Sequence, residues 1–196
     1  MQLSVSKLEA LKELLATPQS IVILSHTNPD GDAVGSSLAW AEILRSEGHQ
    51  VTCILPNRYP YYLDFMPDIS SVVIFKNDDK GAAKEAVKRA DIIFFLDFHL
   101  LSRLELLGEL IDENQHAKRI LIDHHLNPVE DFDLMISYPE ASSTCYMVAL
   151  LVETMFGAES ISKDMAINIF VGMMTDTGNF AFSSVTPDVF RMVSVL

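Results

Sequence analysis

The sequence predicts an α/β fold with a doubly wound, mainly parallel sheet of about five strands flanked by helices. Short apolar segments alternate with segments of helical periodicity along most of the chain. The segment Ile92–Leu96 is apolar without interruption, which is typical of a central strand that helices cover on both faces. Hydrophobic residues make up 49% of the 196 residues, which is enough to build the core of such a sheet.

The expected strands are short, apolar and bounded by turn residues. They span residues 21–25, 51–55, 71–75, 91–96 and 119–122, with an edge strand at 134–137. The expected helices show helical spacing of apolar residues and are bounded by capping residues, glycine or proline. They span residues 4–16, 33–47, 80–89, 101–114, 143–156, 162–174 and 189–196.

The composition limits the classes of function. Because 27 acidic residues outnumber 14 basic ones, the formal net charge is −13 and long duplex nucleic acid is not an expected partner. The two cysteines, Cys53 and Cys145, fit apolar positions and indicate a reducing compartment without disulfides. No apolar run approaches the roughly 20 residues that span a bilayer, and the first helix is unlike a signal peptide. We therefore expect a cytoplasmic protein without membrane contact.

The stretch from His26 to Ser37 carries the densest set of possible metal ligands. It follows a strand pattern and precedes a helical pattern, so His26, Asp30 and Asp32 are expected at the carboxyl end of a strand. Ligands bind at that end in open parallel sheets. Two aspartates so close in sequence repel each other unless a cation lies between them, and a divalent metal would remove that repulsion.

Three further groups of acidic and histidine side chains follow other predicted elements. They are Asp97 after one strand, Asp123-His124-His125 after the next, and Asp176 in a turn after an apolar helix. The carboxyl ends of parallel strands share one edge, so these groups should converge with the first. Mixed carboxylate and imidazole sets suit manganese, zinc, iron or cobalt better than magnesium or calcium. The ligands are too many for one ion, whereas two ions about 3.5–4 Å apart would use them.

Each group has a simpler explanation when taken alone. Asp-Gly-Asp is most often a surface turn, a strand-end aspartate often caps the next helix, and a His-His pair is usually solvated or packed. Asp-Thr-Gly is also found in aspartic proteases, but the helix before it and the α/β pattern disagree with that class. The presence of four such groups at one predicted edge is what favours a metal centre.

These motifs resemble those of the DHH phosphoesterase family, which is named for the triplet Asp123-His124-His125. The segment from His26 to Asp32, Asp97 after an apolar strand, and Asp176-Thr-Gly match the other family motifs in order and spacing. The segment Asn-Pro-Asp-Gly-Asp-Ala-Val-Gly-Ser is most similar to the corresponding motif of the nanoRNase branch. That branch comprises the bifunctional oligoribonucleases and 3′-phosphoadenosine-5′-phosphate (pAp) phosphatases. The resemblance implies a DHH catalytic domain that hydrolyses phosphate esters with two divalent ions, most often Mn²⁺, with Mg²⁺ or Co²⁺ as alternatives.

The resemblance also implies which residues would hold the metals. One metal would be bound by His26, Asp30 and Asp97. The second would be bound by Asp32, Asp97, His124 and Asp176, so that Asp97 bridges the two. Together the cations would lower the pKa of a shared water, so that hydroxide attacks the phosphate in line. His125 would face the substrate phosphate and protonate the leaving group, and Asp123 would orient an imidazole from behind.

Other polar side chains near these motifs are weighed as substrate contacts. Arg103, Asn179 and Ser143 are the candidates, although an ion pair, a turn and a helix cap explain them without a substrate. The N–H groups near Ser143 and Thr144 are suited to phosphate, since helix N-termini bind anions, but capping explains these residues fully. His99 is interpreted as a solvated residue.

Residues 1–185 are expected to form the catalytic domain, and residues 186–196 to begin a linker helix toward a C-terminal substrate-binding domain. The nanoRNase branch carries such a domain with a glycine-rich, histidine-containing motif, which this sequence does not match. We therefore expect the chain to be a fragment whose activity depends on that domain. A natural gene product of only about 22 kDa would contradict this.

Several functions are compared at this point. A phosphoesterase acting on short oligonucleotides or small nucleotide phosphates such as pAp is the main expectation, and a homodimer is compatible with it. A pyrophosphatase or exopolyphosphatase, or a cyclic-dinucleotide phosphodiesterase, would use the same metals. A metal-binding regulatory module without turnover is disfavoured because the ligand set is complete. A Rossmann nucleotide-binding domain is disfavoured because no Gly-x-Gly-x-x-Gly turn follows the first strand.

Overall fold

The computed structural model describes residues 1–129 and 131–196, and within these residues six strands form one sheet. The strand order is β3-β2-β1-β4-β5-β6, and every pairing is parallel. The strands are β1 (Ser20–Leu24), β2 (Gln50–Leu55), β3 (Val73–Ile74), β4 (Ile92–Leu96), β5 (Lys118–Asp123) and β6 (Leu134–Ser137). The doubly wound parallel sheet is thus confirmed, with six strands where about five were expected, because the edge strand β6 pairs with β5.

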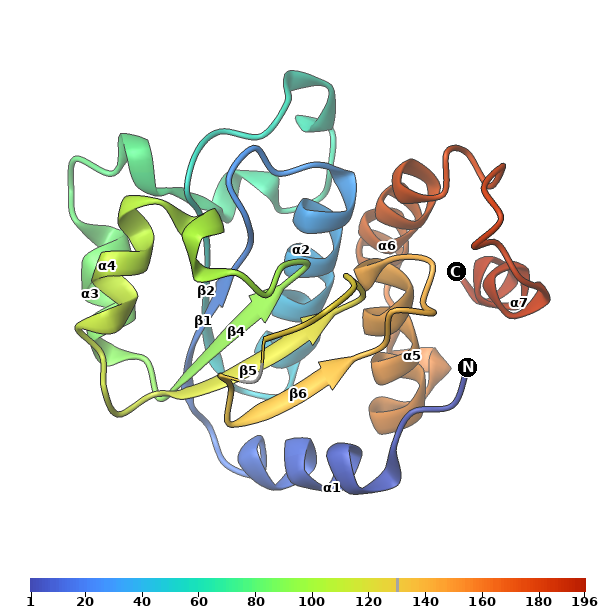
Figure 1. Ribbon diagram of the computed structural model, residues 1–196, viewed down its shortest axis with the longest axis horizontal. Helices are drawn as coiled ribbons and strands as arrows, with labels where there is room; N and C mark the ends of the chain where they lie inside the picture. The colour runs from blue at the N-terminus through green and yellow to red at the C-terminus, as the bar shows by residue number, and fades with distance from the viewer. Residues whose placement is uncertain (130) are drawn as a thin grey trace.

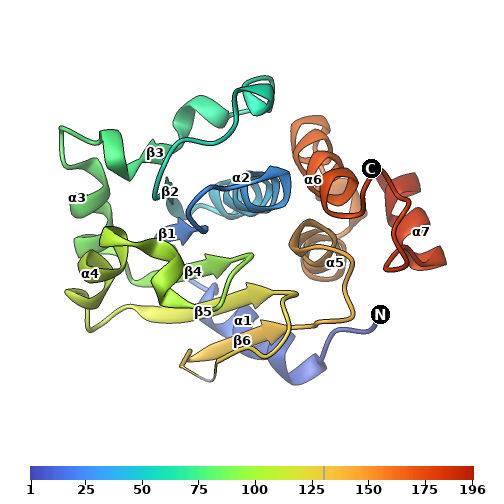
Figure 2. The ribbon, with the colours of Figure 1, turned by 45° about the horizontal axis from the view of Figure 1, so that its top comes forward.

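Helices cover both faces of the sheet (Figures 1 and 2). The first face packs against α1 (Val5–Leu14), α2 (Gly31–Ser46) and α5 (Thr144–Phe156). The second face packs against α3 (Ala82–Arg89) and α4 (Leu106–Asp112). Outside the first layer, α6 (Lys163–Asp176) contacts α2 and α5, and α7 (Pro187–Val195) contacts α5. Short 3₁₀ turns lie at Tyr61–Leu63, Ile69–Ser71, Phe75–Asn77, Leu101–Leu104 and Ala158–Ser160.

The core divides along the faces of the sheet because successive strand side chains point in opposite directions. In β1, Ile21 and Ile23 join the cluster under α2 and α5, whereas Val22 and Leu24 join the cluster under α3 and α4. One uninterrupted apolar strand therefore contributes side chains to the hydrophobic clusters on both faces of the sheet. This explains the sequence pattern of the central strands.

The order of the strands reverses between β1 and β4, the two neighbours at the centre of the sheet. From β1 the chain continues toward β2, and from β4 it continues toward β5, so the loops that leave these two strands diverge. Open α/β sheets bind ligands in the crevice at this point. His26 follows β1 and Asp97 follows β4, so the topology places both at the crevice.

Helices α2, α5 and α6 approach one another closely because two glycines lie between them. A Cβ atom at Gly35 would lie 2.4 Å from the carbonyl oxygen of Asn168, and one at Gly172 would lie 2.1 Å from Sγ of Cys145. Neither position has room for a larger side chain. This close packing brings the end of α6, which carries Asp176, to the start of α2, which carries Asp32.

Three sequence expectations need correction. The second helix begins at Gly31 and not at residue 33, because Asp30 caps it and accepts hydrogen bonds from the next backbone N–H groups. The helix expected over 101–114 is interrupted at Glu105, whose φ is 52° and ψ is −132°, so a 3₁₀ turn precedes α4. The strand expected over 71–75 is reduced to β3.

Residues 186–196, expected to begin a linker helix, contain α7, which packs on the body of the domain. Val189 and Met192 are buried, and both terminal nitrogens of Arg191 donate to the carboxylate of Glu153 at 2.9 Å. Among the helices in the described part of the chain, none has the length and apolarity needed to cross a membrane.

Candidate active site

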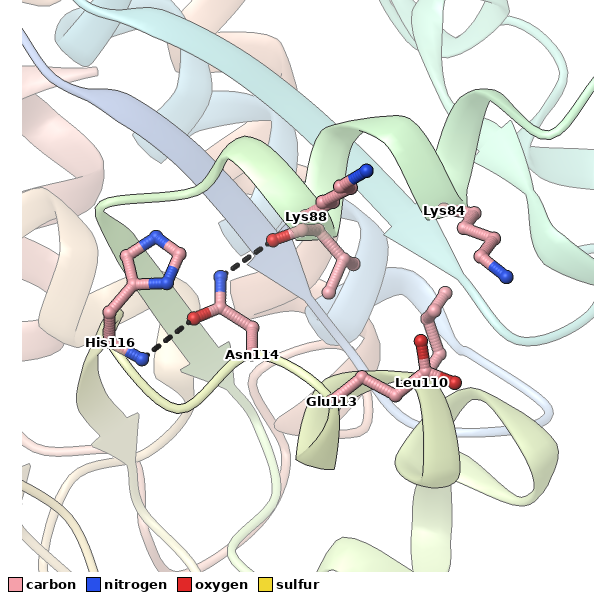
Figure 3. A pocket seen from close by; sticks show the side chains of 7 residues that line it. Lys84, Lys88, Leu110, Glu113, Asn114 and His116 are labelled. Carbon is pink, nitrogen blue, oxygen red and sulfur yellow. Dashed lines mark hydrogen bonds between the residues drawn. The ribbon is translucent and has the colours of Figure 1, made fainter.

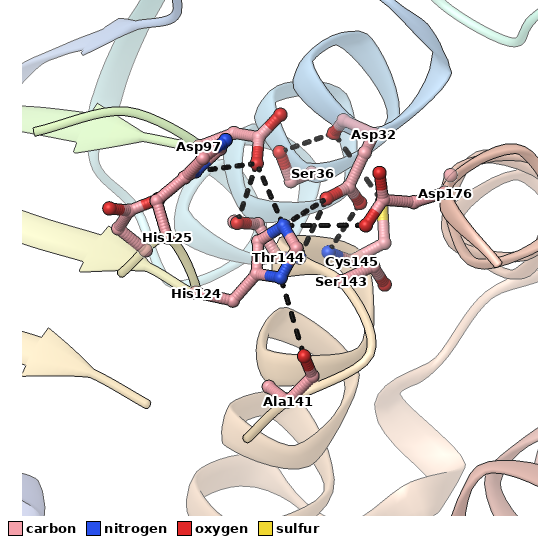
Figure 4. Close-up of polar contacts among 12 residues, drawn as sticks. Asp32, Ser36, Asp97, His124, His125, Ala141, Ser143, Thr144, Cys145 and Asp176 are labelled. Atoms are coloured by element: carbon pink, nitrogen blue, oxygen red, sulfur yellow. Dashed lines mark hydrogen bonds and ion pairs between the residues drawn. The ribbon is translucent and has the colours of Figure 1, made fainter. Parts of the chain in front are cut away.

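Six side chains expected to bind metals come together at the carboxyl edge of the sheet. Figure 4 shows four of them, Asp32, Asp97, His124 and Asp176. One potential ligand atom from each of His26, Asp30 and Asp97 lies within 4.8 Å of the other two. The same holds for Asp32, His124 and Asp176. These residues come from the ends of β1, β4 and β5, the start of α2 and the end of α6, so the fold assembles them from five separate elements.

The turn from β1 into α2 is held by the side chain of Asp30. Oδ1 of Asp30 accepts hydrogen bonds from the backbone N–H groups of Asp32 and Ala33, each at 3.0 Å, and thereby caps α2. Asp32 is buried in the first turn of the helix. His26 is also buried, with Nδ1 2.8 Å from the carbonyl oxygen of Thr27. A carbonyl partner at Nδ1 leaves Nε2 as the ligand nitrogen.

Asp97 lies at the centre of the group. It has a φ of 68°, in the left-handed region, and its backbone N–H donates to the carbonyl oxygen of Ile122 at 3.1 Å. Oδ2 lies 3.5 Å from Nε2 of His26, and Oδ1 lies 3.5 Å from Nε2 of His124. The buried carboxylate therefore faces both halves of the group, as a bridging ligand would.

Nε2 of His124 faces three carboxylates, as Figure 4 shows. It lies 3.3 Å from Asp176, 3.5 Å from Asp97 and 3.8 Å from Asp32. Burial opposes the charged imidazole, but the hydrogen bond that His124 donates to Asp97 and the negative charges of Asp32, Asp97 and Asp176 outweigh it and raise the pKa of His124 to about 10. Burial and the nearby charge of Asp97 raise the pKa of Asp32 well above its usual value.

This donor set fits divalent metals. Asp32 and Asp97 are both buried, and within the described residues their ion-pair partners are histidines and not lysine or arginine. A buried cluster of carboxylates needs a cation, because desolvated negative charges repel each other. Without metal, the proton on His124 supplies that positive charge. Three aspartates around an imidazole are suited to a divalent ion that would replace that proton.

Asp123 lies behind this group and binds two imidazoles. Its fully buried carboxylate accepts from Nδ1 of His125 at 2.7 Å and from Nδ1 of His99 at 3.0 Å. Burial favours the neutral acid, but these two hydrogen bonds outweigh it and lower the pKa of Asp123. The hydrogen bond that His125 donates to Asp123 is the main cause that raises the pKa of His125, which is half-exposed.

The expected substrate contacts differ in their positions. Nη2 of Arg103 lies 2.8 Å from Nδ1 of His26, so the guanidinium is at the site. Asn179 is exposed in a left-handed turn, and its backbone N–H donates to Met174. Ser143 is fully buried and its hydroxyl accepts from Tyr146 as the cap of α5, which leaves no surface for a substrate.

Two residues of the site were not recognised in the sequence. His99, expected to be solvated, is mostly buried and bound to Asp123, a pairing that the adjacency of β4 and β5 could have indicated. Thr144, interpreted as part of a helix cap, donates its hydroxyl to Asp97 at 3.0 Å. Its N–H binds the carboxylate of Asp32, so it is not available to a phosphate as the helix-terminus interpretation would require.

A separate hollow between α3 and α4 has no comparable chemistry (Figure 3). The buried amide of Asn114 donates to the carbonyl oxygen of Val87 at 2.7 Å and accepts from the backbone N–H of His116 at 3.0 Å. These bonds join α3 to the loop before β5. Since the polar groups of Asn114 are used in this way, we interpret the hollow as structural.

Comparison with known proteins identifies the class to which the fold and site belong. The profile of the DHH family, N-terminal domain, matches residues 20–173, and the chain belongs to the DHH family. It is 29% identical over 191 residues to the bifunctional oligoribonuclease and PAP phosphatase NrnA of Thermus thermophilus, covering 97% of this chain and 53% of that protein. It is 26% identical over 179 residues to the cyclic-di-AMP phosphodiesterase PdeA of Listeria monocytogenes, covering 88% of this chain and 27% of that protein.

A solved structure agrees closely with this fold. An exopolyphosphatase-related protein from Bacteroides fragilis superposes with a TM-score of 0.93 at 34% identity, over 98% of this chain and 56% of that one. The chain spans about half the length of the NrnA relatives that it matches. The resemblance to the DHH family and its nanoRNase branch, inferred from the motifs, is thereby confirmed.

Proposed function

We propose that the protein is a metal-dependent phosphoesterase that hydrolyses short oligonucleotides, pAp or both. The observation that carries the proposal is the convergence of the two ligand groups on the shared carboxylate of Asp97. Relatives named as oligoribonuclease and PAP phosphatase support the substrate class.

The proposed metal ligands are those that the motifs indicated. His26, Asp30 and Asp97 would hold one ion, and Asp32, Asp97, His124 and Asp176 would hold the other. Mixed oxygen and imidazole donors suit several transition metals, and manganese is proposed among them because the resemblance to the DHH family implies it. When bound, two divalent ions supply charge neutralisation for the phosphate and lower the pKa of a water.

His125 is proposed to protonate the leaving oxygen of the substrate. Its Nδ1 is hydrogen-bonded to Asp123, so Nε2 is the atom left to face a substrate, and about two fifths of the side chain is exposed. The carboxylate of Asp123 favours the protonated ring, which lets the imidazole hold a proton near neutral pH. General acids of this kind work best when their pKa lies near the working pH.

Arg103 is proposed to bind a substrate phosphate. Its backbone carbonyl oxygen accepts from the N–H of Thr27 at 2.8 Å, which fixes the segment that carries it beside the turn after β1. Its guanidinium lies at His26, next to the proposed metals. If Nε2 of His26 binds a metal, Nδ1 carries a proton and donates to Thr27, so Arg103 is released from that nitrogen and free to bind phosphate.

The test combines metal content with a panel of substrates. The chain is loaded with Mn²⁺, desalted and measured by elemental analysis, then assayed with a dinucleotide, pAp, cyclic di-AMP and pyrophosphate. We expect about two ions per chain and turnover of the dinucleotide or pAp. Asp112→Asn is the matched control, because Asp112 forms an exposed ion pair with Arg119 far from the site.

The other outcomes assign the site differently. Turnover of pyrophosphate or cyclic di-AMP alone would move the protein to another activity within the DHH family. Stoichiometric metal without turnover of any of the four substrates would favour the regulatory module. A chain that binds no stoichiometric metal would contradict both the ligand assignment and the proposed activity.

Three further expectations are kept as proposals. A C-terminal substrate-binding domain would follow residue 196 in the natural protein, which the mass of the natural gene product tests. The protein would work in the cytoplasm, which cell fractionation tests. Two chains would pair as a homodimer, which light scattering tests.

A further inference from the structure

Helix α5 begins between the buried carboxylates of Asp32 and Asp97 (Figure 4). The backbone N–H groups of Thr144 and Cys145 donate to Oδ2 and Oδ1 of Asp32, each at 2.7 Å. The hydroxyl of Thr144 donates to Oδ1 of Asp97 at 3.0 Å. Thr144 therefore contacts one carboxylate through its backbone and the other through its side chain.

The hydroxyl of Thr144 is not needed to cap its own helix. Ser143 performs that task, because its Oγ accepts from the backbone N–H of Tyr146 at 3.0 Å. An ionised carboxylate can only accept, so the bond to Asp97 fixes the hydroxyl of Thr144 as the donor. The side chain is fully buried, and a β-branched residue has few rotamers, so the direction of this donor is defined.

Asp97 is the residue whose orientation this donor controls. The terminal torsion of an aspartate is broad, so the carboxylate could otherwise rotate at the end of β4. In the observed orientation, Oδ2 faces His26 and Oδ1 faces His124, each at 3.5 Å from Nε2. A rotation would change both distances at once. The hydroxyl of Thr144 is bound to Oδ1 and opposes that rotation.

We propose that Thr144 is a positioning residue that holds the carboxylate of Asp97 in the orientation that serves both halves of the metal centre. The inference rests on the proposed function, in which Asp97 is the ligand shared by two ions. Through its N–H group, Thr144 also holds the carboxylate of Asp32 in place. One residue therefore links the proposed ligand that follows β4 to the proposed ligand in α2.

Three variants of the full chain test this role. Thr144→Val removes the hydroxyl, keeps nearly the same volume and preserves the N–H group that binds Asp32. Thr144→Ser restores the hydroxyl with a smaller side chain. Thr154→Val makes the same substitution on the exposed face of the same helix and is the matched control.

The primary measurement is Mn²⁺ affinity by titration calorimetry of the metal-free protein. We expect Thr144→Val to weaken the Mn²⁺ affinity by about tenfold to a hundredfold, which is the usual effect of removing a hydrogen-bond partner of a metal ligand. Thr144→Ser and Thr154→Val should stay close to wild type. Turnover of a dinucleotide should require correspondingly more Mn²⁺ in Thr144→Val. The KM of this variant for the dinucleotide, measured at saturating Mn²⁺, should equal that of the wild type.

Equal Mn²⁺ affinity in Thr144→Val and wild type would overturn the inference, as would equal losses in Thr144→Val and Thr144→Ser. Circular dichroism of each metal-free variant checks the fold. If the valine variant does not fold, Thr144→Ala removes the same hydroxyl, and wild-type affinity in that folded variant would also overturn the inference. A wild-type chain that binds no Mn²⁺ would overturn the proposed function first.

Discussion

Nδ1 of His125 lies 2.7 Å from Oδ1 of Asp123, whose carboxylate is fully buried behind the candidate active site. The bond fixes the imidazole so that Nε2 is directed away from Asp123. Because the second oxygen of the same carboxylate binds His99, Asp123 is held from two sides and has little freedom to rotate. The orientation of His125 is therefore set by residues that are two and 26 positions away from it in sequence.

Replacing Asp123 by asparagine should lower the pKa of His125. The hydrogen bond to a charged carboxylate is the largest cause of the raised pKa, and an amide carries no charge. NMR titration of the metal-free chain measures the pKa directly, and we expect turnover to fall about 10- to 100-fold. Asp133→Asn, just before β6, also removes a carboxylate with two hydrogen bonds, here to the first residues of β5, and should alter neither quantity. An unchanged titration of His125 would contradict the assignment.

Mn²⁺ affinity should rise with pH because His124 must lose its proton to bind metal. Its pKa in the metal-free chain is raised to about 10, so the ring is protonated at neutral pH. We expect the affinity to increase about tenfold per pH unit between about pH 6.5 and 8.5, with release of one proton. Calorimetry in two buffers with different ionisation enthalpies counts that proton. A flat profile, without proton release, would show that His124 does not bind metal.

The same raised pKa predicts how the stability of the metal-free chain depends on pH. Since the folded chain binds the proton of His124 more tightly than the unfolded chain, this contribution to stability is complete below about pH 6.5. It is lost as the pH rises through about 10. Urea unfolding of the metal-free chain between these limits measures it, and His124→Gln should remove that part of the slope.

The sequence was sufficient for the central strands and for the convergence of the candidate ligand side chains. Continuous apolar runs identified central strands such as β4, and the rule that parallel strands end at one edge placed His26, Asp97 and Asp123 together. These features depend on local pattern and on topology. Neither requires knowledge of how individual side chains pack.

Contacts that depend on tertiary packing could not be predicted in the same way. Thr144 and Asp97 are 47 positions apart, and a threonine beside two serines gives the same sequence signal as an ordinary helix cap. The interruption at Glu105 is another example, since local periodicity favours a continuous helix there. In the structure, Oγ1 of Thr27 donates to the carboxylate of Glu105 at 3.1 Å, a contact with the turn after β1 that periodicity does not encode.

Asp97→Asn should remove metal and activity together, because one substitution affects both ligand groups. An amide is a weaker ligand than a carboxylate and leaves less negative charge to hold two cations. We expect the content of Mn²⁺ after desalting to fall well below two ions per chain, measured by elemental analysis, with a loss of at least about 100-fold in turnover. Near-normal metal content and turnover would rule out the bridging role.

Gly35→Ala should destabilise the domain by about 1–3 kcal/mol, which urea unfolding of the metal-free chain would measure. The added Cβ would lie 2.4 Å from the backbone carbonyl oxygen of Asn168, which cannot move away as a flexible side chain could. Gly108→Ala, in α4, is the control, because its Cβ would lie 3.4 Å from its nearest neighbour, the carbonyl oxygen of Leu101. That variant should be neutral or more stable by about 0.5–1 kcal/mol.

The same Gly35→Ala variant tests whether the packing of α2 on α6 sets the geometry of the proposed metal centre. Asp32 lies on α2 and Asp176 on α6, so a displacement of one helix from the other would separate two proposed ligands of one ion. Gly35→Ala should therefore bind Mn²⁺ more weakly than Gly108→Ala under conditions in which both remain folded. Equal affinities in the two variants would show that the ligands keep their positions when the helices move.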